Sequence, residues 1–116
     1  MRLRTTLVST ASAVALVLTI AGTASAAEGE FSYRYTDAAG ETRKAELIDP
    51  DNAPVCIEVP EVANTPDAHA FRPRNQTNVR AIGFKASGCV GTDSFELAAK
   101  VGRGSDKTLF RSVLFA

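Results

Sequence analysis

The chain has few of the side chains that carry catalytic chemistry. Its 116 residues include one histidine, one methionine, two cysteines and no tryptophan. A Ser-His-Asp or Cys-His site would have to use His69, and no nucleophile motif stands anywhere in the sequence. We therefore expect a protein that is not an enzyme, with no catalytic residue and no cofactor.

The chain also lacks a hydrophobic run long enough to span a membrane. Its longest apolar stretch, residues 7–20, holds about 14 residues, whereas a spanning helix needs roughly 20. Arg2 and Arg4 precede this stretch and Ala24-Ser25-Ala26 follows it, which is the layout of a secretory signal peptide. We predict that residues 1–26 are removed and that residues 27–116 are secreted as a single domain without membrane attachment. An uncleaved anchor is the alternative.

Cysteine is limited to one pair, Cys56 and Cys89. Export takes the chain to an oxidising compartment, so we expect one disulfide between them. The loop-entropy argument assigns such a bond ~3–4 kcal/mol of stability. The alternative is a pair of free, buried thiols.

Net charge is absent, but the two signs are separated along the chain. The formal net charge is zero for the whole chain. Residues 27–67 carry a net charge of −7 and residues 68–116 a net charge of +5. We favour an arrangement in which these halves pair in space and neutralise each other, and a bipolar surface is the alternative. Because there is no basic run, we expect no nucleic-acid binding.

Convincing helical periodicity is missing from the predicted domain, and apolar residues alternate instead. Phe31, Tyr33 and Tyr35 alternate with polar residues, and residues 30–48 are typical of a β-hairpin. Further strands are expected at residues 55–59, 78–85, 95–97 and 109–115. The pattern predicts an all-β fold, a small antiparallel sandwich or partly open barrel of about six strands.

The most hydrophobic expected strand lies at the C-terminus. Alternation would place its apolar side chains on both faces, with Leu109, Val113 and Phe115 on one and Phe110 and Leu114 on the other. We expect this strand to be covered on both faces and central to the core. We expect Arg111 at a sheet rim, paired with Glu58 or Glu46.

Residues 60–77 show no periodicity and contain three prolines. We predict a long irregular loop, and a loop stiffened by proline is preorganised for binding. Its candidate interaction segment is 61–74, with the side chains Glu61, Asn64, Pro66, His69, Phe71, Arg72 and Arg74. We expect a monomeric binding or structural module. The alternative function is a protease inhibitor, whose partner is an extracellular protease held by this segment. The alternative for the segment itself is a passive surface connector.

Short motifs that have the form of known sites lack the rest of the pattern. Asp49, Asp51 and Asn52 resemble the start of a calcium loop, but prolines stand where its glycine and glutamate belong. Asn75-Gln76-Thr77 has the form of a glycosylation sequon, and we expect it to be a turn before a strand. We expect no metal site.

Residues 78–115 resemble part of a known family. The segments that carry the resemblance are Phe84, Gly88-Cys89-Val90-Gly91, Phe95-Glu96-Leu97 and Arg111-Ser112-Val113. In order and type they are similar to one Greek-key motif of the βγ-crystallins, which small secreted actinobacterial proteins, some of them protease inhibitors, also carry. The resemblance implies a Greek-key half. It argues against the family's calcium site, because alignment on Ser112 places Lys107, Thr108 and Arg111 at ligand positions.

Overall fold

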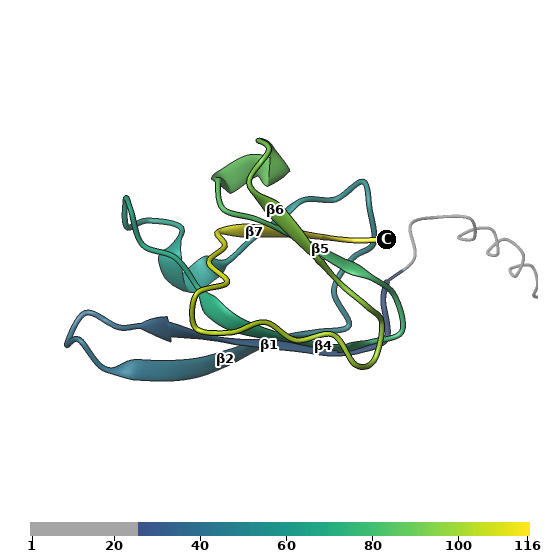
Figure 1. Ribbon diagram of the computed structural model, residues 1–116, viewed down its shortest axis with the longest axis horizontal. Helices are drawn as coiled ribbons and strands as arrows, with labels where there is room; N and C mark the ends of the chain where they lie inside the picture. Colours follow the sequence, from purple (N-terminus) through teal and green to yellow (C-terminus); the bar gives the residue numbers. More distant parts are fainter. Residues whose placement is uncertain (1–25) are drawn as a thin grey trace, which may run out of the picture.

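The computed structural model describes residues 26–116, so all of the predicted signal peptide except Ala26 lies outside the described residues. The described chain forms two antiparallel sheets that lie against each other as two layers (Figure 1). Its strands are β1 (Gly29–Thr36), β2 (Thr42–Ile48), β3 (Ile57–Glu58), β4 (Phe71–Thr77), β5 (Ala81–Phe84), β6 (Ser94–Leu97) and β7 (Ser112–Phe115). Within residues 26–116 the only helical segments are two short 3₁₀ turns, η2 (Pro60–Val62) and η3 (Ser87–Cys89). The predicted all-β fold is confirmed.

The first sheet has the strand order β2-β1-β4. β1 and β2 form the predicted hairpin, which runs from Glu30 opposite Ile48 to the turn at Asp37. The Asp37 carboxylate holds this turn, because its Oδ1 accepts hydrogen bonds from the backbone N–H groups of Ala39 and Glu41, each at 2.9 Å. A side chain that replaces missing backbone partners in this way is typical of aspartate at a turn.

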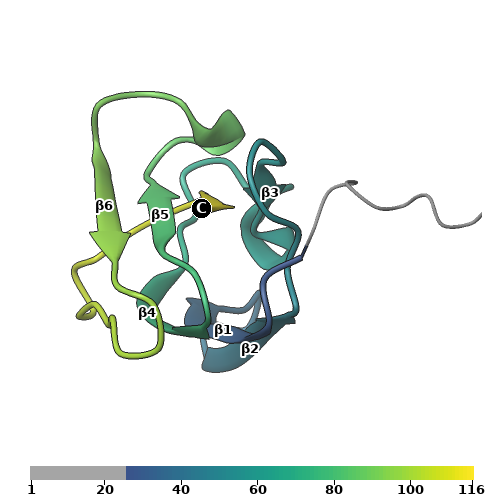
Figure 2. The same cartoon turned by 90° about the vertical axis from the view of Figure 1, so that its right-hand side faces the viewer.

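The second sheet has the order β3-β7-β5-β6, and β5 and β6 lie side by side in Figure 2. Gly83 of β5 pairs with Phe95 of β6. The Phe95 ring covers Gly83 so closely that any Cβ at this position would overlap the ring. Glycine is therefore required here by the approach of an aromatic ring across the strand pair.

The core between the sheets is built around aromatic rings. Phe31 and Tyr33 point inward from β1, and Phe31 meets Phe110 and Phe115 edge to face, with ring centroids 5.8 and 5.3 Å apart. Phe31, Phe110 and Phe115 are fully buried. Each such side chain contributes about 1.5–3 kcal/mol through burial, so this cluster accounts for much of the stability of a small domain.

β7 lies inside its sheet, as predicted for the C-terminal strand. Val113 and Phe115 are buried in the core, and Leu114 on the other face is half-buried. The predicted place of Phe110 on that other face is wrong. Phe110 precedes β7 and pairs with Ala70 in an isolated bridge, so the alternation of β7 does not extend to it.

Arg111 does not pair with Glu58 or Glu46. Its Nη1 donates hydrogen bonds to the backbone carbonyls of Ala68 at 2.7 Å and Thr65 at 2.9 Å. These carbonyls belong to a segment of turns in which Thr65 O also accepts from Ala68 N, and a guanidinium can serve several acceptors at once.

Only the first part of residues 60–77 is irregular. From η2 to Ala68 the backbone folds into successive tight turns, in which each donating N–H bonds to the carbonyl three residues earlier. The rest forms β4, which contradicts the prediction of one long loop. The strand escapes pattern analysis because its buried side is polar, with Asn75 and Thr77 fully buried, and because Pro73 lies beside a bulge.

The buried amide of Asn75 ties β4 to the second sheet. Its Nδ2 donates to the carbonyls of Val79, Leu97 and Ala98 at 2.9, 3.2 and 3.1 Å, and its Oδ1 accepts from Thr77 Oγ1 at 2.7 Å. Asn75-Gln76-Thr77 therefore lies in a strand rather than in the expected turn.

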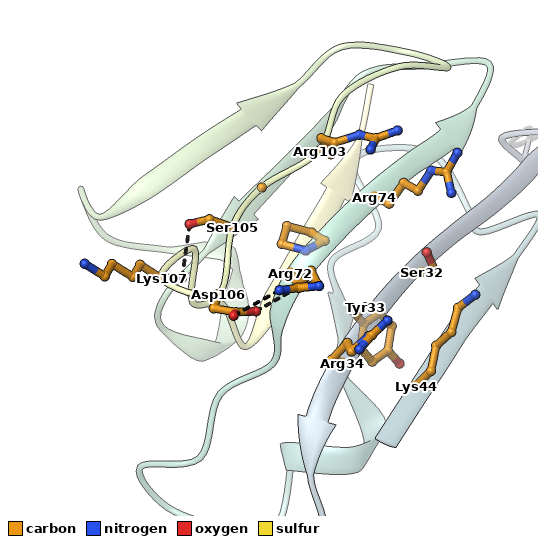
Figure 3. A pocket seen from close by; sticks show the side chains of 12 residues that line it. Ser32, Tyr33, Arg34, Lys44, Arg72, Arg74, Arg103, Ser105, Asp106 and Lys107 are labelled. Atoms are coloured by element: carbon orange, nitrogen blue, oxygen red, sulfur yellow. Dashed lines mark hydrogen bonds and ion pairs between the residues drawn. The ribbon is translucent and has the colours of Figure 1, made fainter. Parts of the chain in front are cut away.

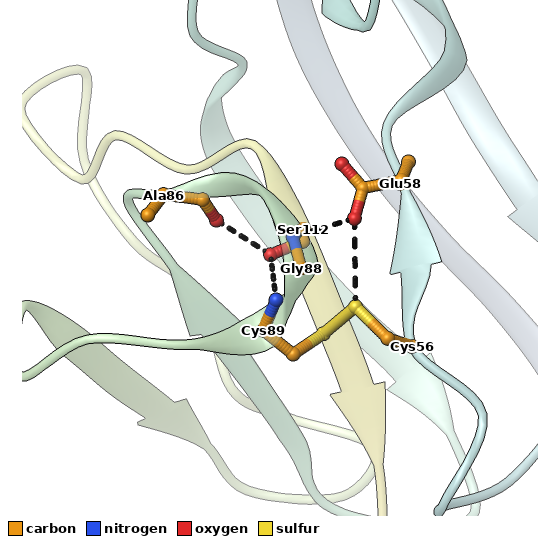
Figure 4. The surroundings of a disulfide bond; sticks show 6 residues. All are labelled: Cys56, Glu58, Ala86, Gly88, Cys89 and Ser112. Carbon is orange, nitrogen blue, oxygen red and sulfur yellow. Dashed lines mark hydrogen bonds between the residues drawn. A yellow bond between two sulfur atoms is a disulfide. The ribbon is translucent and has the colours of Figure 1, made fainter.

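The predicted disulfide between Cys56 and Cys89 is present, with the two Cα atoms 5.9 Å apart. Figure 4 shows how neighbouring groups fix the corner that carries Cys89. Gly88 N donates to a Glu58 carboxylate oxygen at 2.7 Å, and Cys89 N donates to Ser112 Oγ at 2.9 Å. The corner is thus attached to β3 and β7 by hydrogen bonds as well as by the covalent bond. Within residues 26–116 no helix is long and apolar enough to cross a membrane.

The acidic and basic halves do not neutralise each other through ion pairs. In the described part of the chain, Asp37 and Glu41 both pair with Arg43, all within residues 27–67. The remaining pairs lie within residues 68–116: Arg72–Asp106, Arg80–Glu96 and Lys85–Asp93. The favoured prediction that the two halves neutralise each other is therefore wrong at the level of ion pairs. Among the described residues, basic side chains of both halves remain on the surface without an acidic salt-bridge partner from the other half.

Candidate functional site

A basic groove lies on the outer face of the first sheet. It has a volume of about 540 Å³ and is bordered by β1, β2, β4 and residues 103–107. Residues 102–105 run along the free edge of β4, where Asn75 N donates to Gly102 O and Gly104 N donates to Pro73 O, each at 2.8 Å. The groove is therefore built on hydrogen-bonded strands, which give it a rigid floor.

Six basic side chains line the groove against a single acid, Asp106. The bases are Arg34, Lys44, Arg72, Arg74, Arg103 and Lys107 (Figure 3). Lys107 points away from the other five in this view. Within the described residues, Arg72 is the only base of the six that forms a salt bridge. The groove therefore carries a concentrated positive charge.

The groove contains two pairs of like charges. In each pair, the two basic residues lie directly opposite each other on adjacent backbone segments. Arg34 of β1 is the register partner of Lys44 of β2. Arg74 of β4 is the partner of Arg103 in an isolated bridge. Like charges in directly opposite positions destabilise a sheet. Both pairs border the one groove, so repulsion between like charges is concentrated there.

Arg72 enters the groove through a β-bulge. The register between β1 and β4 shifts between Ser32 and Arg34, and Arg72 has a left-handed φ of 51°. Bulges redirect side chains and often lie next to functional sites. Arg72 Nε and Nη2 donate to the two carboxylate oxygens of Asp106 at 2.7 and 3.0 Å. Hydrogen bonding from Arg72 lowers the pKa of Asp106, and the charge of Arg34 adds to this effect.

The opposite end of the same sheet face is acidic. Glu46 of β2 lies diagonally across from Glu30 of β1. A hydrogen bond between their side chains, together with repulsion between their charges, raises the pKa of Glu46. One sheet face thus presents a basic groove at one end and a pair of carboxyl groups at the other, which fits the bipolar alternative from the sequence.

The predicted interaction residues fall into two groups. Arg72 and Arg74 line the basic groove and Phe71 begins β4, so all three belong to a strand rather than to a loop. The others, Glu61, Asn64, Pro66 and His69, lie in the turn segment of residues 60–69. Glu61 accepts a hydrogen bond from the buried Tyr33 hydroxyl at 2.6 Å. Desolvation of Tyr33, followed by this hydrogen bond, raises the pKa of the Tyr33 phenol well above its ordinary value.

Four of the six groove bases were not predicted as site residues: Arg34, Lys44, Arg103 and Lys107. Arg34 and Lys44 belong to the acidic half of the sequence, where the net charge conceals them. Only the register of β1 with β2 brings them together. A usable signal was the spacing of Arg72 and Arg74, because residues two apart in a strand face the same side.

In the described part of the chain, no group of three or more histidine, cysteine, aspartate or glutamate side chains is placed to hold a metal ion. No family model, curated protein or solved structure matches this chain. The basic groove is therefore interpreted from its own chemistry.

Proposed function

We propose that this protein is an exported, non-enzymatic binding domain whose basic groove holds an anionic ligand. The proposal rests on the two pairs of positive charges that lie directly opposite each other, Arg34 with Lys44 and Arg74 with Arg103. A bound anion relieves the repulsion within each pair, so ligand binding and sheet stability favour the same state. Export is supported by the signal-like N-terminal sequence and by the disulfide.

Arginine is well suited to this task, because its planar guanidinium presents paired donors to phosphate, sulfate and carboxylate groups. The Arg72–Asp106 contact has this geometry within the groove, since Nε and Nη2 of Arg72 donate to the two carboxylate oxygens of Asp106. We expect the unpaired bases around it to receive a ligand in the same way.

The test is calorimetric titration of the purified protein with two anionic probes, pyrophosphate and dextran sulfate, at low ionic strength. The variant carrying both Arg34→Ala and Arg74→Ala should lose at least about tenfold in affinity, because two charge-assisted contacts are removed. The matched control also removes two charges, through Arg80→Ala and Lys85→Ala, and Lys85 pairs with Asp93 outside the groove. Arg80 is also exposed, but it pairs with Glu96 away from the groove.

Equal losses in the control and in the groove variant would mean that net charge alone attracts the probes. Absence of binding by either probe to the unmodified protein would reject the proposal outright.

Protease inhibition is the second candidate, and the fixation of the turn segment by Arg111 favours it. Three backbone carbonyls, of Ala63, Thr65 and Ala68, accept from this one guanidinium at 3.5, 2.9 and 2.7 Å. Residues 63–67 remain exposed to solvent. An exposed segment held in one conformation loses little entropy on binding a protease.

Incubation with a panel of secreted serine and metalloproteases tests this candidate. Inhibition that is lost in Arg111→Ala and retained in Arg111→Lys would support it. Cleavage of the protein by every protease without inhibition would remove it.

A further inference from the structure

We infer that the ligand of the basic groove is a linear polyanion, a chain bearing repeated phosphate or sulfate groups and no bases, which crosses the sheet from Lys44 to Arg103. This inference rests on the proposed function of the groove. It adds that the two like-charged pairs act together on one chain rather than each on a separate small ion.

The separation of the pairs supports a chain. Lys44 lies on β2, Arg34 on β1, Arg74 on β4, and Arg103 on the segment that follows the outer edge of β4. These are three neighbouring strands and a segment bridged to the last of them, and paired strands lie about 4.8 Å apart, so ~14 Å separates the backbones at Lys44 and Arg103. The pairs are also offset along the strands, because the partner of Arg74 on β1 is Ser32, two residues before Arg34.

A single phosphate or sulfate is too small to engage both pairs. Charge-assisted hydrogen bonds require approaches of about 2.7–2.9 Å, so one tetrahedral anion contacts the donors on one side of the groove. A chain carries several anionic groups and places one at each pair. Between the pairs the groove is lined by Ser32, whose side chain is small and carries no charge.

The groove lacks the features that favour nucleic acid. Single-stranded nucleic acids bind through aromatic platforms on which bases stack, in addition to phosphate contacts. Tyr33 is the only aromatic residue that lines this groove, and its side chain is 1% exposed because the ring belongs to the core. The surface therefore offers charge and hydrogen-bond donors but no stacking surface.

The experiment compares probes of equal chemistry and different length by titration calorimetry of the full exported protein. Inorganic sulfate is compared with dextran sulfate, and pyrophosphate with long-chain polyphosphate. We expect each chain to bind at least about 100-fold more tightly than its short counterpart, because linked groups raise the effective concentration at the second pair. The chain that binds more tightly identifies the ligand group as sulfate or phosphate.

Variants at the two ends of the path test the joint action of the pairs. Lys44→Gln and Arg103→Gln should each weaken chain binding about tenfold and reduce the salt dependence of log Kd by about one. Lys85→Gln and Arg80→Gln are matched controls, since these bases form salt bridges away from the groove. Lys44→Arg and Arg103→Lys should restore binding, which separates loss of charge from misfolding.

Equal affinity for short and long probes would overturn the inference that the ligand is a linear polyanion, while the proposed anion-binding function would stand. Tighter binding of a single-stranded oligonucleotide than of either chain would overturn it in favour of nucleic acid. Loss of binding by all probes would reject the proposed function as well.

Discussion

Asp106 occupies the basic groove as a built-in anion. Its carboxylate accepts hydrogen bonds from Nε and Nη2 of Arg72, which an incoming ligand would otherwise contact. Replacing Asp106 by Asn preserves the size of the side chain and removes its charge. We therefore expect D106N to bind dextran sulfate several-fold more tightly at neutral pH, measured by calorimetry, with Asp93→Asn as a control outside the groove.

The affinity for dextran sulfate should also depend on pH through Asp106. Because Arg72 lowers the pKa of Asp106, the carboxylate stays ionised to a lower pH than an ordinary aspartate does. Affinity of the unmodified protein should rise only as the pH falls through that lowered pKa, and D106N should lack this rise. Weaker binding by D106N would show instead that Asp106 orients Arg72 for the ligand.

Tyr33 makes stability depend on alkaline pH. Burial and the hydrogen bond to Glu61 raise the pKa of the folded-state phenol above the ordinary value of 10.0, so folding favours the protonated form. This contribution is fully present below pH 10 and declines as the pH rises toward the raised pKa. Melting temperatures measured from pH 8 to 11 should fall above pH 10. In Tyr33→Phe the fall should be shallower, although the lost hydrogen bond costs about 1 kcal/mol at neutral pH. An unchanged slope in Y33F would contradict this assignment.

At the scale of single elements, the C-terminal segment that contains β7 contributes much of the stability of the core. Deleting residues 109–116 removes three fully buried apolar side chains, of Phe110, Val113 and Phe115. Their burial is worth roughly 5–9 kcal/mol, which is comparable with the whole stability of a small domain. We expect an unfolded or aggregating product in thermal melts and size-exclusion chromatography.

Two milder changes calibrate that result. Phe115→Ala should cost about 3–5 kcal/mol. Removal of Ala116 alone breaks its two backbone hydrogen bonds with Arg80 and should cost only about 1–2 kcal/mol. A cooperative melt of the 109–116 deletion would show that β7 is peripheral to stability.

The sequence predicts elements well where hydrophobic alternation follows the sheet, and poorly where polar groups are buried. The hairpin of β1 and β2, the disulfide and the C-terminal strand follow from patterns within or between a few residues. β4 does not, because Pro73, Asn75 and Thr77 form its buried side. Their burial is permitted by hydrogen bonds to partners up to 23 residues away, which no local pattern reveals.

At the scale of the whole molecule, the site depends on strand register. Arg34 and Lys44 come from the acidic half, while Arg72, Arg74, Arg103 and Lys107 come from the basic half. Net charge along the chain indicates an uneven distribution but not the place where the bases meet. Arg72 and Arg74 could be selected from the sequence, and their four companions required the sheet. The resemblance to βγ-crystallins stays a prediction.

The predicted export can be tested by the mass of the whole molecule. We predict cleavage after Ala26 and one disulfide, so the intact mass of protein recovered from the medium should equal that of residues 27–116 less two hydrogens. Alkylation under denaturing, non-reducing conditions should add nothing. A mass that retains residues 1–26 would contradict the predicted signal peptide, and two alkylated thiols would contradict the disulfide.

The buried amide of Asn75 limits the choice of cells for making this protein. Asn75-Gln76-Thr77 is an acceptor sequence for N-linked sugars, which eukaryotic secretory pathways attach while the chain is still emerging. Once folded, Nδ2 of Asn75 is enclosed and donates to three carbonyls, so the folded domain has no room for a glycan there. A sugar added first would keep β4 from docking. Production in yeast or mammalian secretion systems should therefore yield misfolded, retained material, while a periplasmic bacterial host avoids the conflict.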